Sequence, residues 1–205
     1  MNILTIPLMA VLYCTTAACR ADSSTENAAP RDDEIWNPAT YNKITVGTSN
    51  QFDVVRAFGK PVREDFAGPQ DGNEVWYIYD KGGQFPGQFT VIVEKESGIV
   101  TAMILNPMDL TRKDVIEKLG NDYVTTRYDF CPGFDEAEAA PVFQAPNGSA
   151  TYVEYRSRGI AVLVDEGGEV YDIRYLKRPV GFKSRSDCEQ ALAARKARHP
   201  TVKRP

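Results

Sequence analysis

The chain has 205 residues, of which 42% are hydrophobic and 25% are charged, so it can bury one large or two small globular cores. Its 24 basic and 28 acidic side chains leave a formal net charge of −4, which argues against a protein that binds nucleic acid through a basic surface. The one histidine, His199, lies near the C-terminus, which excludes a histidine metal cluster and a buried Ser-His-Asp triad.

Residues 1–19 predict an export signal. Residues 3–18 carry no charge, and at about 16 residues this apolar run is shorter than the roughly 20 that a membrane-spanning helix needs. The run ends in Thr16-Ala17-Ala18-Cys19, which resembles the lipobox of bacterial lipoproteins. Cys19 is therefore the candidate lipidation site, and ordinary cleavage after Ala18 or Ala21 is the alternative. Both interpretations place the chain in the periplasm or, as a lipoprotein, on the inner leaflet of the outer membrane.

Export leaves Cys131 and Cys188 as the remaining cysteine pair, because Cys14 and Cys19 belong to the signal or the lipid anchor. In an oxidising compartment we expect these two to form a disulfide. Closing that loop would stabilise the fold by roughly 4 kcal/mol. The alternative is a reactive thiol, but Cys131 has no CxxC partner or visible thiolate activator.

The polar segment 20–38 contains Pro30 and Pro38 and is typical of a flexible tether. Residues 40–107 and 108–178 then share four matching blocks in one order, which indicates two copies of one unit. The blocks are Asp53–Gly59 with Asp114–Gly120, Trp76–Tyr79 with Tyr152–Tyr155, Phe89–Glu94 with Ile160–Asp165, and Val100, Met103 and Leu105 with Val170, Ile173 and Tyr175.

Each unit is predicted to contain a short helix followed by strands. Asn50 and Thr111 are good N-caps with an acid three residues on, and Gly59 and Gly120 can end each helix. The blocks that follow are rich in β-branched and aromatic residues and predict an antiparallel meander. We therefore expect an α+β protein of two tandem units, each a short helix or helix pair packed on a three-stranded meander. One such unit buries little, so the copies should pack together or continue one sheet.

The same segments carry a resemblance to a known family. They are Tyr41-Asn42-Lys43-Ile44-Thr45-Val46-Gly47-Thr48, Val54-Val55, Phe58-Gly59-Lys60-Pro61 and Trp76-Tyr77-Ile78-Tyr79. This pattern resembles the SmpA/OmlA (BamE-like) outer-membrane lipoproteins, and it is similar to the β-lactamase inhibitor protein family, in which two such units occur in tandem. The resemblance implies a binding protein without catalytic activity, acting in outer-membrane assembly or as an inhibitor.

The candidate partner-binding residues are aromatic, because aromatic side chains dominate interface hot spots. They are Phe85, Trp76, Tyr77, Tyr79, Phe134, Phe143, Tyr152 and Tyr155. Phe134 and Phe143 belong to the long insertion between Gly120 and Tyr152, and long loops are usually functional or disordered. The alternatives are a solvated loop without a role, a Phe85 folded back onto the core, and strand aromatics that only pack the two repeats together.

Catalysis and cofactors are not predicted. Asp135, Glu136 and Glu138 could form a carboxylate pair for a hydrolase, but adjacent acids in a Pro-rich loop are usually solvated. In the predicted helix and tail at 179–205, seven basic and two acidic side chains follow from Lys183 onward. This end could bind anionic headgroups or an acidic protein, or it could simply be solvated.

Together these patterns predict an exported envelope protein, anchored by a lipid or free, that binds another envelope protein in outer-membrane assembly or as a scaffold. No metal, cofactor or nucleic acid is expected, and membrane contact is expected only through the lipid. The alternative is an inhibitor or immunity protein of an envelope enzyme.

Overall fold

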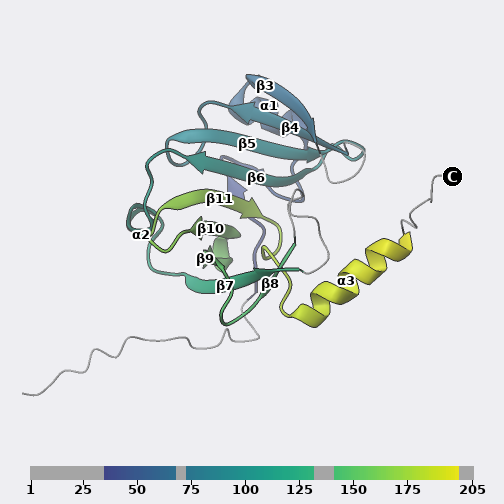
Figure 1. Ribbon diagram of the computed structural model, residues 1–205. Coiled ribbons are helices and arrows are strands. Elements are labelled where there is room, and N and C mark those ends of the chain that lie inside the picture. The colour runs from purple at the N-terminus through teal and green to yellow at the C-terminus, as the bar shows by residue number, and fades with distance from the viewer. Residues whose placement is uncertain (1–34, 68–72, 132–140, 199–205) are drawn as a thin grey trace, which may run out of the picture. The chain divides into compact units, whose positions relative to one another are not determined.

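The computed structural model describes residues 35–67, 73–131 and 141–198 (Figure 1). The predicted signal with Cys19, most of the predicted tether and the end of the basic tail lie outside the described residues. The same holds for the loop side chains Phe134, Asp135, Glu136 and Glu138. The predictions made for these positions are therefore not addressed by the fold.

The described chain is built mainly from strands. In order, the elements are β1 (Thr40–Tyr41), β2 (Ile44–Thr45), α1 (Gln51–Phe58), β3 (Arg63–Ala67), β4 (Glu74–Tyr79), β5 (Gly87–Glu94), β6 (Val100–Pro107), α2 (Arg112–Leu119), β7 (Val124–Phe130), β8 (Val142–Gln144), β9 (Ala150–Tyr155), the 3-10 turn η1 (Arg156–Arg158), β10 (Ile160–Val164), β11 (Val170–Leu176) and α3 (Arg185–Arg198).

Nine of the strands form one antiparallel sheet in the order β3-β4-β5-β6-β11-β10-β9-β7-β8, and β1 and β2 form a separate hairpin. The pair β6–β11 lies in the middle of the sheet, and Figure 1 shows these two strands side by side. Their register places Leu105 opposite Ile173 and Met103 opposite Tyr175. The two halves of the chain therefore continue one sheet.

The expected α+β class with two helix-plus-three-strand units is wrong, because the described residues form a mostly β protein around a nine-stranded sheet. Segments expected to be loops overturn the prediction, because they add the strands β3, β7 and β8 to the ends of the sheet. Pairing between β6 and β11 satisfies the backbone edge that each separate meander would have left open, and it realises one of the two expected arrangements, in which the copies continue one sheet.

Helices α1 and α2 begin with the same reciprocal cap. The Asn50 side chain accepts from the backbone N–H of Asp53, whose carboxylate accepts from the Asn50 N–H at 3.0 Å. Thr111 and Asp114 repeat this arrangement at the start of α2. Such caps satisfy backbone donors that an isolated eight-residue helix leaves unpaired, so both helices begin where the sequence predicts.

The helices and the β1–β2 hairpin cover one face of the sheet. Side chains from α1, α2 and the hairpin join inward-facing strand residues in one buried cluster. It includes Ile44, Val54, Val75, Tyr77, Tyr79, Phe89, Val91, Met103, Leu105, Val115, Leu119, Val153, Tyr155, Val162, Ile173 and Tyr175. Alternation along each strand sends the intervening side chains to the opposite face.

Equivalent positions in the two halves make equivalent contacts. The Tyr79 hydroxyl donates to the Gly59 carbonyl at 3.2 Å, and the Tyr155 hydroxyl donates to the Gly120 carbonyl at 3.1 Å. Each bond ties the C-terminal end of a helix to the sheet. The strand register also shifts at matching places, between Ile92 and Val93 and between Leu163 and Val164. An internal duplication predicts this correspondence.

The predicted disulfide is present, with Sγ atoms of Cys131 and Cys188 2.07 Å apart and both side chains buried. It connects the end of β7 to α3. The segment before α3 also covers the outer edge of β8, where the Phe182 N–H donates to the Val142 carbonyl at 2.8 Å. Together these contacts protect an otherwise open sheet edge.

Replacing both cysteines, Cys131→Ala with Cys188→Ala, should lower the free energy of unfolding by up to about 4 kcal/mol, because the unfolded chain regains the entropy of an open loop. Urea denaturation would measure the loss. The wild-type chain in a reducing agent is the control and should show a similar loss. An unchanged unfolding midpoint in both experiments would contradict this account.

Candidate functional site

The predicted partner-binding aromatics lie in different environments. Tyr77, Tyr79 and Tyr155 point into the core beneath the helices, and Tyr152 is buried on the opposite face. Phe85 is also buried, with the Lys118 ammonium 4.8 Å from its ring centroid, so it takes the alternative position against the core. Trp76 and Phe143 are partly exposed, whereas Phe134 lies outside the described residues. Of the described candidates, Trp76 and Phe143 have side-chain surface left for a partner.

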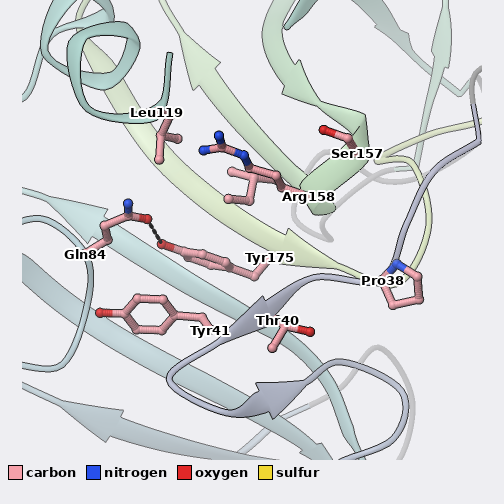
Figure 2. A pocket seen from close by; sticks show the side chains of 9 residues that line it. Pro38, Thr40, Tyr41, Gln84, Leu119, Ser157, Arg158 and Tyr175 are labelled. Carbon is pink, nitrogen blue, oxygen red and sulfur yellow. Dashed lines mark hydrogen bonds between the residues drawn. The ribbon is translucent and has the colours of Figure 1, made fainter. Parts of the chain in front are cut away.

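A cleft of about 470 Å³ opens where the two halves of the chain meet on the helix-covered face (Figure 2). We call it the seam cleft. Its lining comes from both halves, namely Pro38, Thr40, Tyr41 and Gln84 from the first, and Leu119, Ser157, Arg158, Ile160 and Tyr175 from the second. No sequence motif connects segments this far apart, so the sequence did not predict this cleft.

Two tyrosine rings form one wall of the seam cleft. The ring centroids of Tyr41 and Tyr175 are 5.4 Å apart, and both rings pack against Phe89. The Tyr175 hydroxyl donates to the Gln84 side-chain oxygen at 3.4 Å, which is a long bond. The Tyr41 hydroxyl makes no hydrogen bond with any of the described residues. Figure 2 shows both hydroxyls pointing toward the end of the cleft where Gln84 lies.

Burial raises the pKa of Tyr175, and the nearby Tyr41 phenol adds to this shift. Burial also raises the pKa of Tyr41. Both hydroxyls therefore stay protonated at neutral pH and can donate hydrogen bonds, whereas neither is disposed to act as a general base. The wall they form is suited to holding a polar group.

Arg158 provides the positive charge of the seam cleft. It is exposed, and its guanidinium carbon lies 5.9 Å from the centroid of the Tyr155 ring. Among the described residues no carboxylate lies within salt-bridge distance of it, and the adjacent Asp122 instead accepts from the Ser157 hydroxyl at 3.1 Å. Arg158 is also the one charged residue among those described as lining the cleft.

The opposite face of the sheet is covered unequally. In the second half, Trp36 and Val180 pack over Tyr128 and Tyr152. The Trp36 indole N–H donates to the Leu176 carbonyl at 3.3 Å, which holds the ring on this face. This half is therefore closed by the chain's own segments.

In the first half the same face carries an apolar set, which we call the open-face patch: Trp76, Ile78, Ile92 and Ile104. Strand pairing places Trp76 opposite Ile92, and Ile78 and Ile104 on either side of Thr90. Trp76 and Ile104 are partly exposed, whereas Ile78 and Ile92 are buried. None of the four belongs to either apolar cluster of the described chain. The surface that the patch offers is therefore that of Trp76 and Ile104.

A buried polar cluster lies on this face in the second half. The fully buried Glu154 carboxylate accepts from the hydroxyls of Tyr128 and Thr126 at 2.5 and 3.0 Å. Arg156, whose side chain is 11% exposed, lies 3.0 Å from the same carboxylate. Because every carboxylate oxygen has a partner, the cluster can support the sheet without leaving a buried charge unpaired. The sequence analysis assigned Glu154 to a strand but missed this role.

The described part of the chain contains no group of three or more His, Cys, Asp or Glu side chains that could hold a metal ion. Among the described helices none is long and apolar enough to span a bilayer. Comparisons with protein families, curated proteins and solved structures found nothing that matches this chain. The family resemblance of the sequence therefore stays a prediction.

Stability should fall at alkaline pH because several phenols are held in the neutral form. Burial, with smaller contributions from Tyr77 and Glu64, raises the pKa of Tyr79 to about 12. Burial and the Glu154 carboxylate raise the pKa of Tyr128, and burial raises that of Tyr152. Since an unfolded tyrosine ionises at about pH 10, the unfolded chain loses these protons at a lower pH than the folded chain does.

The free energy of unfolding should therefore be independent of these phenols below about pH 10 and decrease as the pH rises further. Urea titrations between pH 8 and 11 would measure it, with tyrosinate absorbance recorded in parallel. Tyr79→Phe should make the decrease less steep. Ionisation of all ten tyrosines near their ordinary pKa in a chain that stays folded would contradict the prediction.

Proposed function

We propose that this chain is an exported envelope protein that acts by binding another protein, and that the open-face patch is its contact surface. One observation carries the proposal. The second half of the sheet covers this face with Trp36 and Val180, whereas no described apolar cluster includes the four side chains of the patch in the first half. A partner protein would cover the exposed surface of Trp76 and Ile104.

The composition of the patch suits a protein interface. Trp76 is partly exposed on β4, and tryptophan is among the residues most enriched in interface hot spots. Its indole N–H donates to the Glu74 carboxylate at 3.1 Å, so the ring is held in place before a partner binds. Strands on both sides fix the neighbouring Ile92 and Ile104. A pre-organised apolar surface reduces the ordering cost of binding.

The charges around the patch indicate the chemistry of the partner. Asp65 lies opposite Trp76 on β3, and Glu74 and Glu94 lie opposite each other at the ends of β4 and β5. Two arginines also border the patch: Arg63, which pairs with Asp65 at 2.9 Å, and Arg174 opposite Ile104, which pairs with Asp172 at 2.7 Å. Because each arginine is paired with an aspartate, Glu74 and Glu94 leave the rim acidic. We infer a partner surface with an apolar centre and a basic rim, since complementary charge orients such complexes.

Site-specific photo-crosslinking in cells that naturally produce the chain would test this surface. A photo-reactive p-benzoylphenylalanine at Ile104 should give one discrete adduct with an envelope protein. Trp76→Ala should reduce the adduct at least tenfold, because truncating a hot-spot tryptophan removes most of its contact energy. Raised salt should weaken it further if the partner's rim is basic.

Phe52 provides the matched control, because it is an exposed aromatic on α1, which packs on the opposite side of the sheet. The probe at Phe52 should give no such adduct, and Phe52→Ala should not affect the adduct formed at Ile104. Equal adducts from both positions, or an adduct formed only with a second copy of the chain, would contradict the proposal. Unchanged thermal unfolding would confirm that Trp76→Ala is folded.

Export has its own test. We expect the mature chain to begin at Cys19, with a diacylglyceryl group on that cysteine if the lipobox resemblance reflects lipidation. Intact mass spectrometry of the chain from envelope fractions would measure both features. Cys19→Ala is the informative variant, because it should abolish lipid attachment and release the chain from the membrane fraction. A full-length chain that keeps Met1 and fractionates with the cytoplasm would contradict export.

A further inference from the structure

We propose that the seam cleft is a binding site for a small carboxylate with an apolar body, such as an aryl or short alkyl acid. The site is separate from the open-face patch, because its lining lies on the helix-covered face of the sheet. A ligand here could bind without competing for the protein surface proposed above. Charge, unused hydrogen-bonding groups and cleft size each support this ligand class.

The charge of the seam cleft favours one negative group on the ligand. Arg158 is the charged residue among its described lining, and it has no carboxylate partner in the described chain. Packing of the guanidinium near the Tyr155 ring holds the arginine at the cleft without neutralising it. A planar guanidinium binds a carboxylate through two parallel hydrogen bonds, which makes a carboxylate the matching anion.

The hydrogen-bonding groups of the wall are incompletely used by the protein. The Tyr41 hydroxyl has no hydrogen-bond partner among the described residues, and the Tyr175 hydroxyl has one long bond to Gln84. In Figure 2 the two hydroxyls and the Gln84 amide lie at one end of the cleft, and the Arg158 guanidinium reaches toward that end from the other wall. The Tyr41 hydroxyl, the Gln84 amide N–H groups and the Arg158 guanidinium can donate to the oxygens of one bound anion, while Tyr175 keeps its bond to Gln84.

The remaining lining combines the polar Thr40 and Ser157 with apolar side chains. Leu119 and Ile160 are buried side chains that reach the cleft, and the face of the Tyr175 ring lies beside them. A volume of about 470 Å³ falls within the range of pockets that bind small molecules. A ligand of aryl-acid size could place its carboxylate near Arg158 and its ring against these side chains.

The cleft is also fixed by contacts outside it. The Lys118 ammonium donates to the Gln84 backbone carbonyl at 2.6 Å, which connects α2 in the second half to the β4–β5 loop in the first. Tyr41 is held by Phe58 and Phe89 as well as by Tyr175. Since both walls are tied down, binding requires little rearrangement.

Three ligands of matched shape and different charge would test the inference by isothermal titration calorimetry on the folded chain. Phenylacetate should bind one site with a dissociation constant of about 1 mM or tighter, as expected for a ligand of this size. 2-Phenylethanol has the same ring and chain but no charge. Phenethylamine has them with a positive charge. Both should bind at least tenfold more weakly, because neither can pair with Arg158.

Variants would locate the site. Arg158→Gln should weaken phenylacetate binding at least tenfold, and Tyr41→Phe, which keeps the ring, should weaken it roughly two- to tenfold. Arg178→Gln is the matched control, because Arg178 is also exposed but does not line the cleft. It should leave the dissociation constant unchanged. Thermal unfolding of each variant should match the wild type, since Arg158 makes no structural ion pair.

The inference would be overturned by three results. One is the absence of saturable phenylacetate binding at concentrations of about 10 mM, where a site of the expected affinity would be mostly filled. Another is equal binding of the three ligands, and the last is equal loss in Arg158→Gln and Arg178→Gln. None of these depends on the open-face patch. Trp76→Ala should leave phenylacetate binding intact, so failure of the proposed protein interaction would be distinguishable from failure of this site.

Discussion

Pairing between β6 and β11 is the constraint on which the rest of the molecule depends. It joins two halves that could each form only a small sheet with an open edge, and it does so with fully buried Leu105 against Ile173 and Met103 against Tyr175. The pairing also fixes both helices over one face of the sheet. Tyr175 is thereby brought against Tyr41, so the seam cleft is a consequence of the same strand pairing.

The sequence predicts local structure well where one residue controls the backbone. Asn50 and Thr111 begin helices, and Gly59 and Gly120 end them with positive φ angles of 81° and 88° that favour glycine. The sequence does not predict the fold where it depends on which strand edges pair. Strand alternation indicates which face each residue takes, but it does not choose between packed copies and one continued sheet. The fold class was wrong because the additional strands β3, β7 and β8 make the protein mostly β.

Strand β3 shows a second limit, because the charged sequence Arg63-Glu64-Asp65 is unusual for a strand and is tolerated at a sheet edge. The run Val124–Phe130 did carry a signal, since β-branched and aromatic side chains occupy its alternate positions, which is typical of a strand. The sites were harder to predict. Each seam-cleft residue is ordinary by itself, and only the fold brings Tyr41, Arg158 and Tyr175 together from distant parts of the chain.

Within the sheet, the two halves differ at the equivalent positions Ile78 and Glu154, which both lie on the face away from the helices. Both are buried, but a buried carboxylate needs partners, and Glu154 has them in Tyr128, Thr126 and Arg156. The second half therefore needs a polar cluster whose hydrogen bonds are all made within the chain. This cluster lies beside an apolar layer that Trp36 covers. Ile78 imposes no such requirement, so the first half can keep an apolar face on which Trp76 and Ile104 stay partly exposed. Divergence at this position therefore separates a half that supports the sheet from a half that is free to contact another protein.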